Sequence, residues 1–253
     1  FLVTIRQLYR ELTGLADYLP SARVNFLFSN LVDQVVDRKS NKSSLSLPEQ
    51  HKLNQICALA EGALESHWSR EIISGKAKLA DFPYHQNYKD LTRLEWHSIH
   101  SCVNHHTHEV LFVGGGPLPL TAIILALDFG LASTVIDCDE KAVNIAQKLI
   151  KKLKLEKLVK VVQADGANFT DYASFNTIFV AALAGLETRT KFGIFQQIKK
   201  LAPTNCHILA RSSWGLRKLL YRPLARSVWK LLTPVLEIRP HNQIVNSAIV
   251  FRK

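Results

Sequence analysis

The chain contains no methionine and only four cysteines, none of which belongs to a CxxC pair. The cysteines at 57, 102, 138 and 206 are scattered. This spacing argues against a disulfide framework or a zinc ribbon and favours a reducing compartment. We therefore expect a cytoplasmic protein.

Long hydrophobic runs are also missing. The longest apolar stretch, residues 117–136, is interrupted by Pro119, Asp128 and Gly130, so it is a poor membrane span. We recognise no signal peptide, although the chain starts at Phe1 and its beginning can have been trimmed. We expect no membrane partner.

Positively charged residues outnumber negatively charged ones, and the formal net charge is +11 over 253 residues. Such a charge can mean nucleic acid or a membrane surface, but the basic residues are dispersed apart from 148–160 and 211–230. A polyanion-binding surface is usually a clustered patch. We favour solvated helix faces and contacts to anionic substrates, and we expect no nucleic acid partner.

Residues 1–105 contain almost no strand pattern. Apolar residues recur at helical spacing over 2–15 and 24–35, and a polar, serine-rich loop follows at 37–46. Ser46 and Glu49 have the spacing of a capping box, which predicts the start of a long helix. We expect a helical N-terminal domain over 1–105.

From Glu109 onward, apolar runs alternate with amphipathic segments, which predicts an α/β fold with a parallel sheet covered on both faces. The expected strands are 109–114, 133–139, 158–165, 176–183, 206–212 and 243–251, with helices between them, notably 140–153 and 186–201. The last strand is a candidate for antiparallel pairing. This second domain spans 106–253, and the apolar content of 47% suffices for a substantial core.

The stretch EVLFVGGGPLPLT, residues 109–121, predicts a strand, a tight turn and a helix. Gly114 to Gly116 allow positive φ and close approach of a ligand. Pro117 and Pro119 remove amide donors that a phosphate cradle would use. The loop therefore suits an uncharged or positively charged nucleoside, and it departs from the dinucleotide fingerprint, whose third glycine would fall at Pro119.

Ligands of such sheets bind beyond the carboxyl ends of the strands. Beside the glycine loop, the residues expected there are Asp137, Asp139, Asp165, Ala181 to Ala184, and Arg211 to Ser213. An acid ending the second strand can accept ribose hydroxyl groups, and Asp165 can reach an adenine amino group. Each aspartate alone could instead cap a helix. Together they indicate an S-adenosylmethionine site.

Two glutamates, Glu61 and Glu65, fall on the edge of the apolar stripe of the long helix and are one turn apart. A half-buried carboxylate beside another has a raised pKa, as a general base near neutrality requires. The alternative is a pair of surface glutamates at the margin of a packed helix.

Two further segments carry candidate ligand groups. Residues 81–96 contain Tyr84 and Tyr88 among polar residues. This pattern is typical of a ligand site, but a packing segment between helices is the alternative. Residues 96–108 hold five histidines and Cys102, but their spacing fits no closed set of metal ligands, and we read them as a connector. We expect no bound metal.

Several stretches together resemble the nicotianamine synthase family. They are FVGGGPLPLT (112–121), ARVNFLFSNLV (22–32), LAEGALESHWS (59–69), FPYHQNYKDLTRLE (82–95), the IDCD turn, VAALAG (180–185), RSSWGLRKLLY (211–221) and HNQIVNSAIV (241–250). The likeness covers nearly the whole chain, with a shorter N-terminal region than in plant members.

The resemblance implies a helical domain that covers a Rossmann-like sheet of class I methyltransferase type, with S-adenosylmethionine as substrate and no metal required. It implies transfer of 3-amino-3-carboxypropyl groups to an amine, with release of methylthioadenosine and formation of a metallophore that chelates transition metals. Glu65 and Tyr88 fall on the family's catalytic positions. The expected nucleoside contacts are Gly114, Gly115, Gly116, Pro117, Leu118, Asp137, Asp139, Asp165, Ala181 and Ala182, and the expected substrate contacts are Glu61, Tyr84, Glu95, Arg211 and Asn246.

Three hypotheses stay open on sequence alone. The first is nicotianamine synthesis from S-adenosylmethionine units. The second is a single transfer to an amino acid such as histidine, as in opine-type metallophore synthesis. The third is an RNA methyltransferase, which the positive charge suggests. A homodimer is a further expectation.

Overall fold

The structure is a computed structural model that describes residues 3–36, 43–103, 107 and 109–253. Its helices are α1 (Ile5–Thr13), α2 (Ala22–Val36), α3 (Leu47–Ser74), η1 (Leu79–Asp81), α4 (His85–His100), α5 (Leu120–Phe129), α6 (Glu140–Lys152), η2 (Asp171–Ser174), α7 (Thr188–Leu201), η3 (Gly215–Leu219) and α8 (Arg226–Leu231). The strands are β1 (Glu109–Val113), β2 (Ala132–Asp137), β3 (Val159–Gln163), β4 (Thr177–Val180), β5 (His207–Ser212), β6 (Thr233–Ile238) and β7 (Ser247–Arg252).

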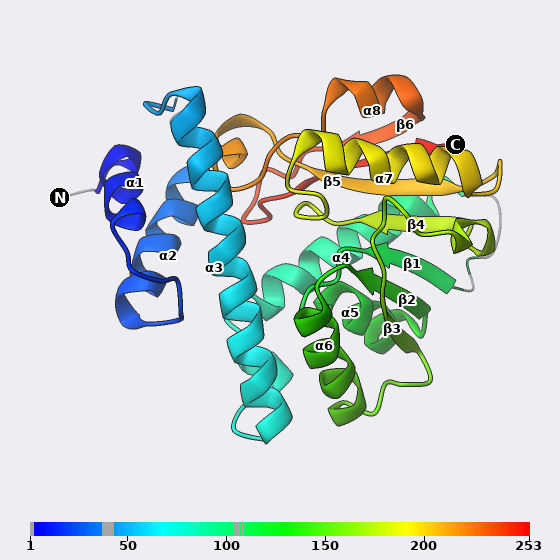
Figure 1. Cartoon of the computed structure of the whole chain (residues 1–253), viewed down its shortest axis with the longest axis horizontal. Coiled ribbons are helices and arrows are strands. Elements are labelled where there is room, and N and C mark those ends of the chain that lie inside the picture. Colours follow the sequence, from blue (N-terminus) through cyan, green and yellow to red (C-terminus); the bar gives the residue numbers. More distant parts are fainter. Residues whose placement is uncertain (1–2, 37–42, 104–106, 108) are drawn as a thin grey trace.

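The strands form one seven-stranded sheet in the order β3-β2-β1-β4-β5-β7-β6. The first five are parallel, and β7 is antiparallel to both β5 and β6. In Figure 1, α7 and α8 lie on one side of the strands and α4, α5 and α6 on the other. The predicted Rossmann-like α/β sheet, including its antiparallel last strand, is confirmed.

Two features of the C-terminal third differ from the sequence prediction. Strand β6 was not predicted, because it is a largely exposed edge strand with Pro234 beside a register shift, a position where an edge tolerates proline. The predicted strand 243–251 begins only at Ser247, since residues 242–244 form a loop. Arg217 donates to the carbonyls of Asn242 (2.9 Å) and Ile244 (3.4 Å), which fixes that loop.

The helical region and the sheet are joined through two cores. Ile72, Trp96 and Ile99, from the end of α3 and from α4, belong to the large core of the sheet. A smaller core holds residues of α1, α2 and α3 together with Leu216, Leu219 and Leu220 from the segment after β5. Helix α3 runs between α1 and α2 on one side and the sheet on the other (Figure 1).

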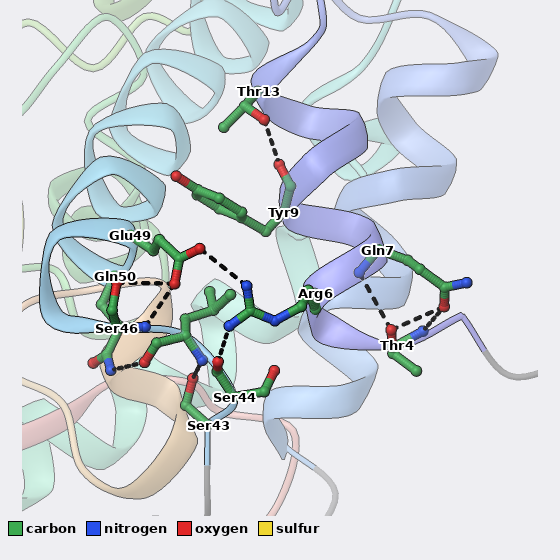
Figure 2. Close-up of polar contacts among 11 residues, drawn as sticks. Thr4, Arg6, Gln7, Tyr9, Thr13, Ser43, Ser44, Ser46, Glu49 and Gln50 are labelled. Atoms are coloured by element: carbon green, nitrogen blue, oxygen red, sulfur yellow. Dashed lines mark hydrogen bonds and ion pairs between the residues drawn. The ribbon is translucent and has the colours of Figure 1, made fainter.

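The predicted start of α3 is confirmed by its cap. The Ser46 amide donates to Glu49 Oε2 at 2.7 Å, as in a capping box. Figure 2 shows that Arg6 of α1 also binds Glu49, and the distance from Arg6 Nη1 to Glu49 Oε1 is 3.1 Å. The cap thus also ties α1 to α3. Residues 37–42 of the predicted loop lie outside the described residues.

The histidine-rich segment is not a simple connector. Its beginning, through His100, forms the last turn of α4, where the imidazoles of His97 and His100 contact Phe129 and Trp96, respectively. His105, His106 and His108 lie outside the described residues. Among the described residues, no group of three or more His, Cys, Asp or Glu is placed to hold a metal ion. Within the same ranges, no helix has both the length and the apolarity to cross a bilayer.

The buried side chain of Asn54 connects α3 to the segment after β5, and a mutation can test this contact. Its Nδ2 donates to the carbonyls of Lys218 and Leu219, both at 2.9 Å. We expect Asn54→Ala to lower the free energy of unfolding by about 1–3 kcal/mol, because a buried acceptor and a part-buried acceptor lose their donor. Denaturant unfolding measures this, with the exposed neighbour Gln55→Ala as control. Equal stability of the two variants would contradict the expectation.

Candidate active site

A cavity of about 470 Å³ opens at the carboxyl ends of the parallel strands. Most of the predicted nucleoside and substrate residues line it: Glu61, Glu65, Tyr88, Gly114, Gly115, Gly116, Pro117, Leu118, Asp137, Asp139, Asp165, Ala181, Ala182, Arg211 and Asn246. The topology therefore brings together segments separated by up to 185 positions in the chain, from residue 61 to residue 246.

The glycine loop has no room for side chains. A Cβ atom on Gly115 would lie 2.1 Å from Val135 Cγ1, and one on Gly116, where φ is +62°, would lie 2.8 Å from Glu65 Oε2. The Gly114 amide donates to the Ile136 carbonyl (2.8 Å), and the Gly116 amide donates to Asp137 Oδ2 (2.8 Å). Since the protein itself takes up these donors, the loop is not an anion cradle.

The three aspartates have different surroundings. Asp137 accepts the amides of Gly116 and Asp139, the latter at 3.0 Å, and so joins the glycine loop to the end of β2. Asp139 is the N-cap of α6 and accepts the Lys141 amide at 2.9 Å, which is the helix-capping role that sequence left open. Asp165 accepts from Ala167 N and from Asn168 Nδ2.

Two carboxylates and two tyrosines form a cluster on the α3 side of the cavity. Tyr88 Oη lies 3.2 Å from Glu61 Oε1 and 3.3 Å from Glu65 Oε1. Tyr221 Oη donates to Glu61 Oε2 at 2.8 Å. Glu61 and Glu65 are therefore not surface glutamates, because both side chains face the cavity and are held by phenol groups.

The surroundings of this cluster favour its neutral forms. Burial raises the pKa of Glu65 well above its usual value, and the charge of Glu61 raises it further, while the Tyr88 hydrogen bond opposes this. Burial also raises the pKa of Glu61, against hydrogen bonds from Tyr221 and Tyr88. Both phenol pKa values are well above normal, first because of burial and then because of Glu61. A raised carboxyl pKa is suitable for a general base.

Arg211, which also lines this cavity, is held by a buried ion pair. Its Nε and Nη2 donate to Glu95 Oε1 (2.7 Å) and Oε2 (2.8 Å), and Nη2 also donates to Thr121 Oγ1 (2.7 Å). Burial disfavours the charged guanidinium, but the Glu95 carboxylate outweighs this and raises the pKa of Arg211. Glu95 is fully buried and lines neither this cavity nor the adjacent one that Tyr84 lines. Its contact is with Arg211.

A second cavity of about 390 Å³ lies between the N-terminal helices and the first cavity. The predicted Tyr84 lines it. The two cavities have five lining residues in common: Glu61, Glu65, Tyr88, Tyr221 and Asn246. The acid and tyrosine cluster is thus the shared wall of two adjoining chambers.

Sequence reasoning missed two hydroxyl-bearing residues that bind charged groups of the site, Tyr221 and Thr121. Tyr221 ends the stretch RSSWGLRKLLY, and Thr121 ends FVGGGPLPLT, so both belong to segments that had already been singled out. Their hydroxyl groups hold Glu61 and Arg211, respectively. Only the contacts across the fold distinguish them from packing residues.

Comparisons with known proteins agree with this site. The model of the family described as "Nicotianamine synthase protein" matches residues 1–253. The chain is 31% identical to nicotianamine synthase 3 and 30% identical to nicotianamine synthase 1 of Arabidopsis thaliana, over 99% and 98% of this chain and 82% of each relative.

Among solved structures, the fold is similar to that of MtNAS in complex with MTA and tNA. The TM-score is 0.84 at 21% identity, and the match covers 98% of this chain and 96% of that one. At this identity the likeness shows the shared fold. With the family match over its whole length, this chain belongs to the nicotianamine synthase family.

Proposed function

We propose that this protein is a transferase that moves 3-amino-3-carboxypropyl groups from S-adenosylmethionine to an amine and releases methylthioadenosine. The observation that carries the proposal is the position of Glu65. Its carboxyl group lies beside the glycine loop, at the wall shared by two chambers. One chamber suits the nucleoside donor and the other the amine acceptor.

The reaction begins with a proton transfer. The acceptor amine is protonated in water and becomes a nucleophile when Glu65 takes one proton from it. The amine nitrogen then attacks the γ-carbon next to the sulfonium. A C–N bond forms, the C–S bond breaks, and its electron pair stays on sulfur in methylthioadenosine. Positioning of the amine, with Tyr88 beside Glu65, decides which carbon on sulfur reacts.

The proposed role of each other residue follows from the chamber that it lines. Asp137 and Asp165 are positioned for the ribose and adenine, with the glycine loop, Ala181 and Ala182 as the surrounding wall. Glu61, Tyr84 and Asn246 face the acceptor chamber. Arg211 faces the donor chamber, where it binds a substrate carboxylate in this proposal, and Glu95 positions its guanidinium group. In this proposal the N-terminal helical domain, predicted over 1–105, is the lid of the reaction chamber.

Five further properties belong to the same proposal. The product chelates transition metals, the protein works in the cytoplasm without nucleic acid, it requires no metal, and two copies associate as a homodimer. Each is open to direct measurement, by metal titration of the product, fractionation, nucleic acid binding, activity in the presence of chelators, and light scattering.

Product analysis tests the proposal against its alternatives. Incubation with S-adenosylmethionine alone is expected to release methylthioadenosine and give nicotianamine by mass spectrometry. Product that forms only when an amino acid such as histidine is added supports the single-transfer alternative. Methylated material with S-adenosylhomocysteine would contradict the proposal and favour a methyltransferase.

The base role predicts the effect of Glu65→Gln. We expect S-adenosylmethionine to bind but transfer to fall by about 100-fold or more, because the amine keeps its proton. Calorimetry and methylthioadenosine release measure the two steps. The control is Glu71→Gln, the same change on α3 at a residue that lines neither cavity. Unchanged turnover in Glu65→Gln would remove Glu65 from this role.

The raised pKa of Glu65 predicts the pH profile. A base acts only when ionised, so the rate should fall as pH decreases through a pKa above the ordinary glutamate range. In Tyr88→Phe the hydrogen bond that lowers this pKa is lost, so the acid limb should move to higher pH. Rates at saturating substrate across pH measure the limb, and a shift to lower pH would refute this assignment.

Contact between the glycine loop and Glu65 predicts that Gly116→Ala impairs catalysis. A methyl group there would lie 2.8 Å from Glu65 Oε2, on backbone that only glycine adopts readily. We expect kcat/KM to fall at least about tenfold. Gly193→Ala in α7 is the control, since its methyl group would meet only Ala167 Cβ at 3.5 Å. Equal kcat/KM of Gly116→Ala and Gly193→Ala would show that the loop tolerates a Cβ atom at position 116.

A further inference from the structure

The turn between β4 and α7, residues 181–187, forms part of the wall of the donor chamber. On its other side is a third cavity of about 150 Å³, which shares four lining residues with the donor chamber: Ala182, Leu183, Gly185 and Leu186. The turn also packs against the glycine loop, because a Cβ atom on Gly114, where φ is +87°, would lie 2.7 Å from Ala184 Cβ. A shift of this turn would therefore change the shape of the donor chamber.

Lys191, in the first turn of α7, binds the 181–187 turn from the side of the third cavity. Its Nζ donates to the carbonyl of Ala181 at 3.3 Å and to the carbonyl of Ala182. The backbone is also close, since a Cβ atom on Gly185 would lie 2.7 Å from Lys191 N. Lys191 does not line the donor chamber, so it acts on that chamber only through the turn.

The ammonium group of Lys191 has no acidic partner within the described part of the chain. The ion pairs found there involve other residues. The other ionisable residues that line the third cavity are Glu187 and Arg222. Burial lowers the pKa of Lys191 to about 8. A buried ammonium group depends on its hydrogen-bond acceptors, and here these are the two carbonyls of the turn.

Resting on the donor chamber of the transfer proposed above, we propose that Lys191 is a positioning residue whose ammonium group holds the 181–187 turn against the glycine loop and so shapes the chamber for a nucleoside. Without the ammonium group, the carbonyls of Ala181 and Ala182 lose a charge-assisted donor, and the packing of the turn against Gly114 is less well fixed. The cost appears as weaker binding of the nucleoside.

Binding of methylthioadenosine, measured by calorimetry, tests this role. Lys191→Met keeps an unbranched side chain but removes the ammonium group, and we expect the Kd at about pH 7 to rise about tenfold, the scale of one charge-assisted hydrogen bond. The control is Lys199→Met, which removes an exposed lysine of α7 that lines none of the three cavities and should leave the Kd unchanged. A Kd of Lys191→Met equal to that of the unmodified protein would overturn the proposal.

The pH dependence of the same Kd separates this role from a purely structural effect of the substitution. Methylthioadenosine is suitable because it lacks the amino group of S-adenosylmethionine, which titrates near pH 8 itself. In the unmodified protein Lys191 loses its charge as pH rises through about 8, so the Kd should rise at least about threefold between about pH 7 and pH 9. A constant Kd over this range would contradict the proposal.

Two variants should abolish this rise for different reasons. Lys191→Met has no group to titrate, whereas the guanidinium of Lys191→Arg, for which the third cavity offers room, stays charged at both pH values. Lys191→Arg should therefore bind methylthioadenosine more tightly than Lys191→Met at about pH 9. A rise in Lys191→Met as large as in the unmodified protein would assign the titration to another group and overturn the proposal.

This inference and the transfer proposal fail on different results. Binding of methylthioadenosine tests Lys191 without any turnover. Formation of methylated material and S-adenosylhomocysteine would contradict the transfer but leave the role of Lys191 in place, because the nucleoside is the same. If the protein releases methylthioadenosine from S-adenosylmethionine while Lys191→Met keeps full affinity, the transfer stands and only this inference is wrong.

Discussion

Two carboxyl groups of like charge, one helical turn apart on α3, set the main constraint on this structure. Glu61 and Glu65 face a cavity, so burial raises the pKa of both, and the charge of Glu61 raises the pKa of Glu65 further. The phenol groups of Tyr88 and Tyr221 offset part of this cost by hydrogen bonding. The result is a carboxyl group ready to accept a proton, located where two chambers meet.

The segment after β5 connects this cluster to the rest of the fold. Arg211, near the end of β5, is bound to Glu95 of α4, and Tyr221, in the segment that follows, is bound to Glu61 of α3. Between them, Leu216 and Leu219 pack in the core of the N-terminal helices. One short stretch therefore links the helices to the sheet and supplies two lining residues of the site. Disturbing its packing should also disturb the acid cluster.

Sequence patterns predicted the local features well because those features depend on neighbours along the chain. The capping box at Ser46, the triple-glycine bend and the parallel strands follow from periodicity and from backbone chemistry. Strand β6 escaped prediction because an exposed edge strand with Pro234 lacks the apolar run of a buried strand. The loop at 242–244 escaped because a distant arginine, Arg217, holds it.

By itself, the sequence determined the α/β fold, the family resemblance, and a glycine-proline loop unsuited to phosphate. Only the tertiary structure decided that Glu65 lies against Gly116, that Glu95 binds Arg211, and that one cluster of acids and tyrosines forms the wall between two chambers. The reason is physical: backbone preferences act between residues close in the chain, whereas burial, charge and shared cavities depend on residues that are far apart in it and meet only in the folded protein.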